Sequence, residues 1–284
     1  MNKILKIGVL LTLISGISDA DFVTIGGAGI AADPATGYGY VNYSYRISRY
    51  EVTGTEFGAA VAADPNVGTY SSDSPNAPAE YVSWYEAAKY CNWLTSGNAY
   101  LGAYTHSGSS FTGIDRASAI AIYGTVCVLP TEDEWYKAAY WRNDPADQWS
   151  LYANGTDTAP IWGTANGWNY YNGEDYAYGG DAWPVGYGAQ EQNGTYDMMG
   201  NVVEWTESSF DASEQVLRGG FNGSSKLGLR SLVRGGGAPS DEYNSGGFRV
   251  AMIPEPSTVL LFGIGGVGAW LLRRSRMKAQ TEEK

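Results

Sequence analysis

The sequence predicts a single mixed α+β domain with little regular secondary structure. Three helix starts are recognisable, two short stretches alternate as strands do, and residues 142–195 show no period at all. With 284 residues, of which 44% are apolar, the chain can bury a core. Its 38 glycines and 22 tyrosines indicate a loop-rich fold with aromatic packing and not a helical bundle.

The three helix starts share one device, the capping box. A hydroxyl side chain caps the amide three residues on, and a Glu at that position reaches back to the cap's own N–H. The second helix is expected over residues 84–95 and the third over residues 132–140, each with one apolar stripe. The three pairs are Thr53 with Glu56, Ser83 with Glu86, and Thr131 with Glu134.

Alternating patterns predict strands near residues 45–52 and 119–129. Residues 142–195 are rich in Gly, Asn, Tyr and Trp. A segment this long without a period would ordinarily argue against order. Its many aromatic residues indicate instead that it packs as structured loops.

The N-terminal 20 residues have the composition of a secretory signal peptide. Lys3 and Lys6 precede an apolar run over residues 7–17, and small residues follow up to an expected cleavage after Ala20. The run is too short to span a bilayer comfortably. Export by this route, with a signal peptidase as processing partner, would place the cysteines in an oxidising compartment.

The C-terminal end combines three features in a fixed order. Residues 254–257 read PEPS, residues 258–272 are apolar, and residues 273–276 read RRSR. Fifteen helical residues rise only about 22 Å, short of a hydrocarbon core of roughly 30 Å, which allows transient membrane contact with the basic cluster in the cytoplasm. Residues 254–278 resemble a PEP-CTERM sorting signal of Gram-negative bacteria. The resemblance implies processing by an exosortase and a host that makes exopolysaccharide.

The remaining segment, residues 21–253, is strongly acidic. It carries 11 basic and 26 acidic residues, a net charge of −15. Such a surface repels phosphate backbones, so nucleic acid is not expected as a partner. A hard cation such as calcium is a natural partner. The acidic residues could equally serve only to keep an exported protein soluble.

Two cysteines and one histidine limit the available chemistry. A zinc site of Cys and His ligands is not expected, nor is catalysis by a Cys–His or Ser–His pair. Cys91 falls on the core stripe of its helix and Cys127 on an apolar strand, so they are either two core residues or a disulfide. His106, in a polar Gly/Ser stretch, is interpreted as a surface-loop residue.

Six short segments resemble, in order, the motifs of the formylglycine-generating enzyme (sulfatase-modifying factor) family. They cover nearly all of residues 21–253, and the resemblance implies one mixed domain related to C-type lectins. The segments are residues 45–53 (YRISRYEVT), 78–87 (PAEYVSWYEA), 129–139 (LPTEDEWYKAA), 196–205 (YDMMGNVVEW), 217–220 (LRGG) and 247–251 (GFRVA).

The resemblance implies two calcium sites. Carried onto this sequence, the first lies in the GNVVEW turn, with Asp197, Gly200, Val202 and Glu204 as ligands. Main-chain carbonyls and a carboxylate are oxygen ligands of the kind calcium prefers. The alternative is that Asn201 and Glu204 only hold the turn by hydrogen bonds.

The second implied calcium site begins at Asn166 and Gly167, which follow Ala165. Either Asp175 or Asp181 would supply the acidic ligand. The spacing between these residues departs from the family pattern, so the acidic ligand is left open.

The family's oxidase chemistry is not expected here. Its two copper-binding cysteines fall at Ser224 and Leu229, and no cysteine follows Cys127. Copper(I) needs soft thiolates, so we expect neither copper nor catalytic residues. A single histidine also rules out the iron site on which some relatives depend.

The sequence therefore predicts an exported, envelope-associated member of this family without oxidase activity, acting as a calcium-stabilised binding or matrix domain. An exopolysaccharide or matrix component is the expected ligand. One alternative is a formylglycine-generating oxidase acting on protein cysteines, and another is a saccharide-binding surface protein. Six aromatic residues could stack on sugar rings or form the core of the loop region: Trp162, Trp168, Tyr170, Tyr171, Tyr178 and Trp183.

Overall fold

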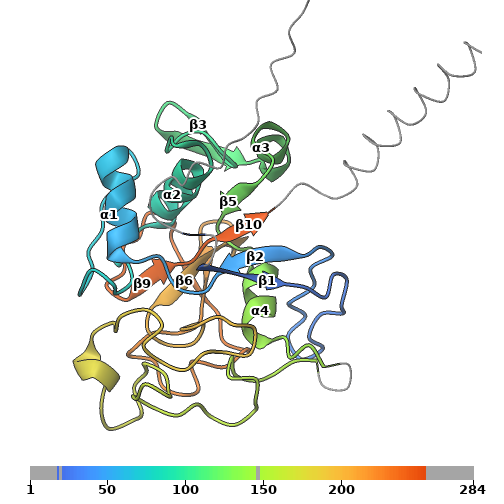
Figure 1. Ribbon diagram of the computed structural model, residues 1–284, viewed down its shortest axis with the longest axis vertical. Helices are drawn as coiled ribbons and strands as arrows, with labels where there is room; N and C mark the ends of the chain where they lie inside the picture. Colours follow the sequence, from blue (N-terminus) through green and yellow to red (C-terminus); the bar gives the residue numbers. More distant parts are fainter. Residues whose placement is uncertain (1–17, 19–20, 145–147, 254–284) are drawn as a thin grey trace, which may run out of the picture.

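A computed structural model describes residue 18, residues 21–144 and residues 148–253 (Figure 1). The expected signal peptide, apart from Ser18, and the expected sorting signal at 254–278 lie outside the described residues. Across the described part of the chain, none of the helices combines the length and apolar character needed to cross a bilayer.

Two four-stranded sheets form the centre of the domain. The first has the order β1-β2-β10-β5 and is antiparallel throughout. The second has the order β8-β7-β6-β9, with β6 antiparallel to β7 and parallel to β9. The strands are β1 (Phe22–Ile25), β2 (Tyr45–Ser48), β5 (Val126–Val128), β6 (Val203–Ser209), β7 (Gln215–Arg218), β8 (Gly235–Gly237), β9 (Gly246–Phe248) and β10 (Ala251–Ile253).

Helices and a hairpin pack around these sheets. In Figure 1, α1, α2 and the β3–β4 hairpin lie at one end of the molecule, and the long loops between α4 and β6 gather at the other. The elements are α1 (Gly54–Ala63), α2 (Trp84–Ser96), β3 (Tyr104–Ser107), β4 (Ser110–Ile114), α3 (Arg116–Tyr123), α4 (Glu132–Tyr140) and the short 3-10 segment η2 (Ala177–Gly180).

All three predicted capping boxes are confirmed. Thr53, Ser83 and Thr131 each accept the N3 amide, and each N3 Glu side chain accepts the cap's own N–H. The second and third predicted helices are confirmed as α2 and α4 within one residue. The expected loop segment after α4 is also confirmed, because η2 is its one named element among the described residues.

The strand predicted over residues 119–129 is wrong for its first half. Residues 116–123 form α3, whose N-cap Asp115 accepts the amide of Ser118 at 2.9 Å. The alternating Ala and Ile residues fit either period, and the capping carboxylate favours the helix. Gly124, at φ +79°, ends the helix, and only β5 is a strand.

Candidate functional site

The turn between Asp197 and Glu204 is built on left-handed backbone. Asp197, Gly200 and Asn201 all have positive φ, at +59°, +85° and +58°. A Cβ on Gly200 would lie 2.2 Å from the carbonyl oxygen of Asn169, so only glycine fits there. The motif's glycine is therefore required by the close approach of a neighbouring loop.

The fully buried side chain of Asn201 connects this turn to three other segments by hydrogen bonds. Its Oδ1 accepts hydrogen bonds from the Trp183 amide at 2.9 Å and from Asn169 Nδ2 at 3.0 Å. Its Nδ2 donates to Glu51 Oε1 at 3.1 Å. The turn thus joins the end of β2 to the long loop region.

Glu204 forms a fully buried ion pair with Arg249. Arg249 Nε donates to Glu204 Oε2 at 2.7 Å, and its terminal nitrogen donates to Oε1 at 2.6 Å. Trp135 Nε1 adds a third hydrogen bond, to Oε2 at 2.8 Å. Arg249 lies between β9 and β10, so the pair links the two sheets.

Asp197 is likewise engaged by protein donors. Trp183 Nε1 and the amide of Gly186 each donate to its carboxylate at 2.9 Å. Burial raises the pKa of Asp197 above its usual value and outweighs these two hydrogen bonds, which lower it. Burial also raises the pKa of Glu191, whose carboxylate interacts with the charges of Arg249 and Asp197, to about 8.

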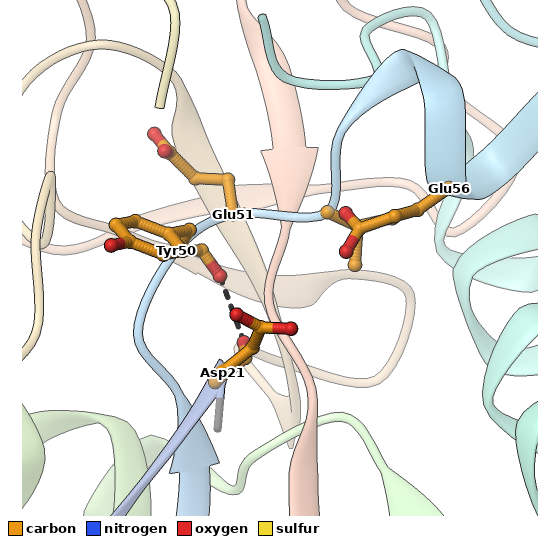
Figure 2. Close-up of a pocket in the computed structure, with 6 residues that line it drawn as sticks. Asp21, Tyr50, Glu51 and Glu56 are labelled. Carbon is orange, nitrogen blue, oxygen red and sulfur yellow. Dashed lines mark hydrogen bonds between the residues drawn. The ribbon is translucent and has the colours of Figure 1, made fainter. Parts of the chain in front are cut away.

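Two buried oxygens in this region have no hydrogen-bond partner in the described part of the chain, Glu51 Oε2 and Asn169 Oδ1. Burial, and then the charges of Asp197 and Glu204, raise the pKa of Glu51 well above its usual range. A cavity of about 10 Å³, roughly the space of one water molecule, adjoins Glu51. Figure 2 shows the Glu51 side chain turned away from the carboxylates of Asp21 and Glu56.

These contacts bear directly on the predicted calcium ligands. The structure brings the four turn residues together, but the Glu204 carboxylate is neutralised by Arg249, and a second cation there would meet a like charge. Glu204 in this arrangement does not fit as a calcium ligand. In the described residues, no three His, Cys, Asp or Glu side chains stand close enough to hold a metal ion between them.

The residues of the second predicted site all lie in the long loop region between α4 and β6. Asn166 is exposed, and its amide donates to Thr164 Oγ1 at 3.3 Å. Gly167 is buried and accepts the amide of Ala189 through its carbonyl. Asp175 and Asp181 are both exposed.

The loop at the family's cysteine positions is closed by other side chains. Ser224 Oγ accepts the amide of Phe221 at 3.0 Å, and Leu229 is fully buried. A Cβ on Gly220 would lie 2.9 Å from Leu229 Cδ2 and 3.0 Å from Ser224 Oγ, so both side chains pack on that glycine. Neither side chain can bind copper or exchange a disulfide.

The two cysteines are free and buried. Burial raises the pKa of Cys91 well above its usual range and that of Cys127 to about 12, so neither is a thiolate at neutral pH. His106 lies half-buried on β3, not in a loop, and packs edge-on against Tyr100 and Phe111.

Residues 25–253 match the model of the sulfatase-modifying factor enzyme 1-like domain, and the chain belongs to that family. Residues 253–276 match the PEP-CTERM protein-sorting motif. That motif implies exosortase-dependent processing and export to the cell envelope or surface of a Gram-negative bacterium.

Curated relatives include two mammalian proteins called inactive C-alpha-formylglycine-generating enzyme 2. The Bos taurus protein is 30% identical over 191 residues, which cover 61% of this chain and 50% of the relative. The Mus musculus protein is also 30% identical over 191 residues, covering 61% and 48%. The chaperone protein LppX of Paenibacillus barcinonensis is 26% identical over 179 residues, covering 57% and 61%. The chain thus spans about half the length of its mammalian relatives.

Solved structures confirm the fold. CarF superimposes with a TM-score of 0.61 at 21% identity, covering 83% of this chain and 98% of CarF. Treponema denticola variable protein 1 gives 0.58 at 22% identity, covering 83% and 95%. PvdO from Pseudomonas aeruginosa gives 0.55 at 19% identity, covering 81% and 93%.

Proposed function

We propose that this protein is a non-catalytic binding or matrix domain of the sulfatase-modifying factor family, displayed at the envelope. The observation that carries the proposal is the loop at residues 219–229, where Ser224 and Leu229 stand at the cysteine positions and pack on Gly220. The name "inactive" given to the two mammalian relatives agrees with it.

An oxidase assay tests this proposal. The full chain, with copper added, is incubated with a cysteine-containing peptide, and mass spectrometry follows conversion of the thiol to the aldehyde. A catalytically competent family member is the positive control. We expect no aldehyde. Aldehyde that disappears in Cys91→Ser or Cys127→Ser would refute the proposal and favour the oxidase alternative.

Saccharide binding is the second candidate function, and the tyrosines around η2 favour it. Trp168, Tyr170 and Trp183 are buried and belong to the core of the loop region, so they cannot stack on a sugar. Tyr178, in contrast, is 55% exposed and has the left-handed φ of +53°, which bulky residues rarely adopt and which often marks functional sites. Tyr176 and Tyr187 are also exposed, and the Tyr187 ring centroid lies 6.3 Å from that of Tyr178.

A glycan array tests this candidate with one matched pair of variants. Tyr178→Ala should lose any saccharide signal that the unmodified protein gives, and Tyr40→Ala, 53% exposed elsewhere, should keep it. Equal signals from the two variants would place the saccharide elsewhere. The absence of a signal from the unmodified protein would remove this candidate.

We also propose that calcium stabilises the domain. At the turn, support comes from Glu51 Oε2, a buried oxygen without a partner whose carboxylate interacts with that of Asp197. Glu204 would not contribute, because Arg249 already neutralises it. Metal analysis and melting of the protein with and without a chelator test the proposal. Unchanged melting and no bound calcium would remove it.

A further inference from the structure

An open groove of about 580 Å³ lies beside the first turn of α1, and its size is typical of sites for small ligands. Residues 54–55 of α1 form one side of it, and residues 70–75 form the other. Among the described residues, none of those that line the groove is basic. The polar side chains in the lining all end in oxygen atoms: Thr55, Tyr70, Ser72, Asp73 and Ser74.

Tyr70 supplies an aromatic surface in this groove, and α1 has a seat for its ring. Gly54 and Gly58 lie one turn apart on α1. A Cβ on Gly58 would lie 2.3 Å from the Tyr70 hydroxyl oxygen, and a Cβ on Gly54 would lie 3.5 Å from its Cε2. Glycine is unfavourable inside a helix, but here it makes room for the ring. Phe57 supports the same ring at a centroid distance of 5.3 Å, and 39% of Tyr70 stays exposed to a ligand.

The sides of the groove are held by hydrogen bonds within the protein. The Thr55 amide and hydroxyl both donate to the carbonyl of Pro75, at 3.0 and 2.6 Å. The Ser72 hydroxyl donates to the carbonyl of Ser74 at 2.6 Å. The groove is therefore formed before a ligand arrives, so binding orders few groups and loses little conformational entropy.

Asp73 carries the charge in the lining of the groove. Its Oδ2 accepts the amide of Ala182 at 2.9 Å, which fixes the carboxylate, and no hydrogen bond within the described residues engages Oδ1. Because Asp73 is exposed, Oδ1 can accept a hydroxyl group of a ligand. Residues 21–253 carry a net charge of −15, so Asp73 and the surrounding surface together repel anionic ligands.

We propose that this groove binds an uncharged saccharide, with one sugar ring against Tyr70 and a sugar hydroxyl on Asp73. The C–H face of a sugar packs on an aromatic ring, and its hydroxyls pair with hydroxyl and carboxylate oxygens. This site rests on the saccharide binding proposed above, and it adds a second contact region and the charge of the ligand. Tyr178 lies four residues before Ala182, so their Cα atoms are at most about 14 Å apart. A saccharide of several residues can therefore extend from Asp73 to Tyr178.

A glycan array with neutral and uronate-bearing saccharides tests this site in the full chain, and we expect binding to neutral glycans only. Isothermal titration with a neutral glycan that binds then compares variants. Tyr70→Ala should weaken binding at least tenfold, because it removes the ring. Tyr70→Phe keeps the ring and should bind as the unmodified protein does. Tyr40→Ala, 53% exposed elsewhere, is the matched control and should leave the affinity unchanged.

Circular dichroism should show that Tyr70→Ala is folded. Asp73→Asn gives an independent result if it is not, and should weaken binding about fivefold, because a charged acceptor holds a hydroxyl more strongly than a neutral one. Unchanged affinity in either folded variant would overturn this site and leave saccharide binding at Tyr178 in place. Binding confined to uronate-bearing glycans would overturn it as well. No binding to any glycan would remove the saccharide candidate together with this site, whereas the non-catalytic proposal is decided separately by the oxidase assay.

Discussion

The buried pair between Glu204 and Arg249 should be one of the strongest single determinants of stability in this domain. Both side chains are fully buried. Glu204→Gln leaves the Arg249 charge without its counter-ion, and the new amide group points a donor at the donors of Arg249 and Trp135. Breaking a pair of this kind costs about 3–5 kcal/mol.

Urea unfolding at equilibrium measures this cost, and the chain offers a matched control. Arg142 and Asp157 form an ion pair at 2.7 Å, but the Asp157 side chain is 66% exposed. Asp157→Asn should cost at most about 1 kcal/mol. The same chemistry at two depths therefore isolates the effect of burial.

A double variant guards against a result caused by misfolding alone. Glu204→Leu combined with Arg249→Met removes both charges, and it should be less destabilised than either single change. A loss of less than about 1 kcal/mol in Glu204→Gln, similar to Asp157→Asn, would refute the reasoning.

Cys91 and Cys127, both buried, should resist a thiol reagent in the folded protein and react after denaturation; rapid reaction of the native protein would contradict their burial. Gly200→Ala should cost about 3 kcal/mol or more by urea unfolding, because a new Cβ meets a main-chain oxygen at 2.2 Å. Gly29→Ala, at φ +76° with open space around it, should cost less, and equal losses would mean that the clash is relieved. Glu80 has a folded-state pKa of about 8 against a usual 4.5, so the folded state keeps a proton that the unfolded state releases between these values. In chelator, stability should therefore fall as pH rises from about 5 to 8, by at most about 1.4 kcal/mol per pH unit and less with solvent screening, and Glu80→Gln should flatten this dependence.

Local signals in the sequence were the most dependable. The capping boxes at Thr53, Ser83 and Thr131 were correctly predicted because each involves residues only three positions apart. The strand predicted from residue 119 failed for the opposite reason. Alternation of Ala and Ile over the four residues 119–122 fits a short helix equally well, and the deciding cap at Asp115 lies outside the pattern.

Only part of the candidate site could be predicted from the sequence. Its turn could be recognised from the motif at residues 196–205. The partners of that turn could not be recognised, because they are distant along the chain. Glu51 lies 150 residues from Asn201, and Arg249 lies 45 residues from Glu204. Without those partners, Glu204 looked like a free ligand.

The sequence alone determined the family, the helix starts and the loss of the two cysteines, because motifs, caps and residue identities are properties of neighbouring positions. Only the tertiary structure decided which carboxylates are neutralised and which are left without a partner. Glu204 meets Arg249, while one carboxylate oxygen of buried Glu51 has no partner among the described residues, and nothing in their local sequence distinguishes them. The physical reason is that the free energy of a charge depends on burial and on the groups that surround it in space, which chain folding alone brings together.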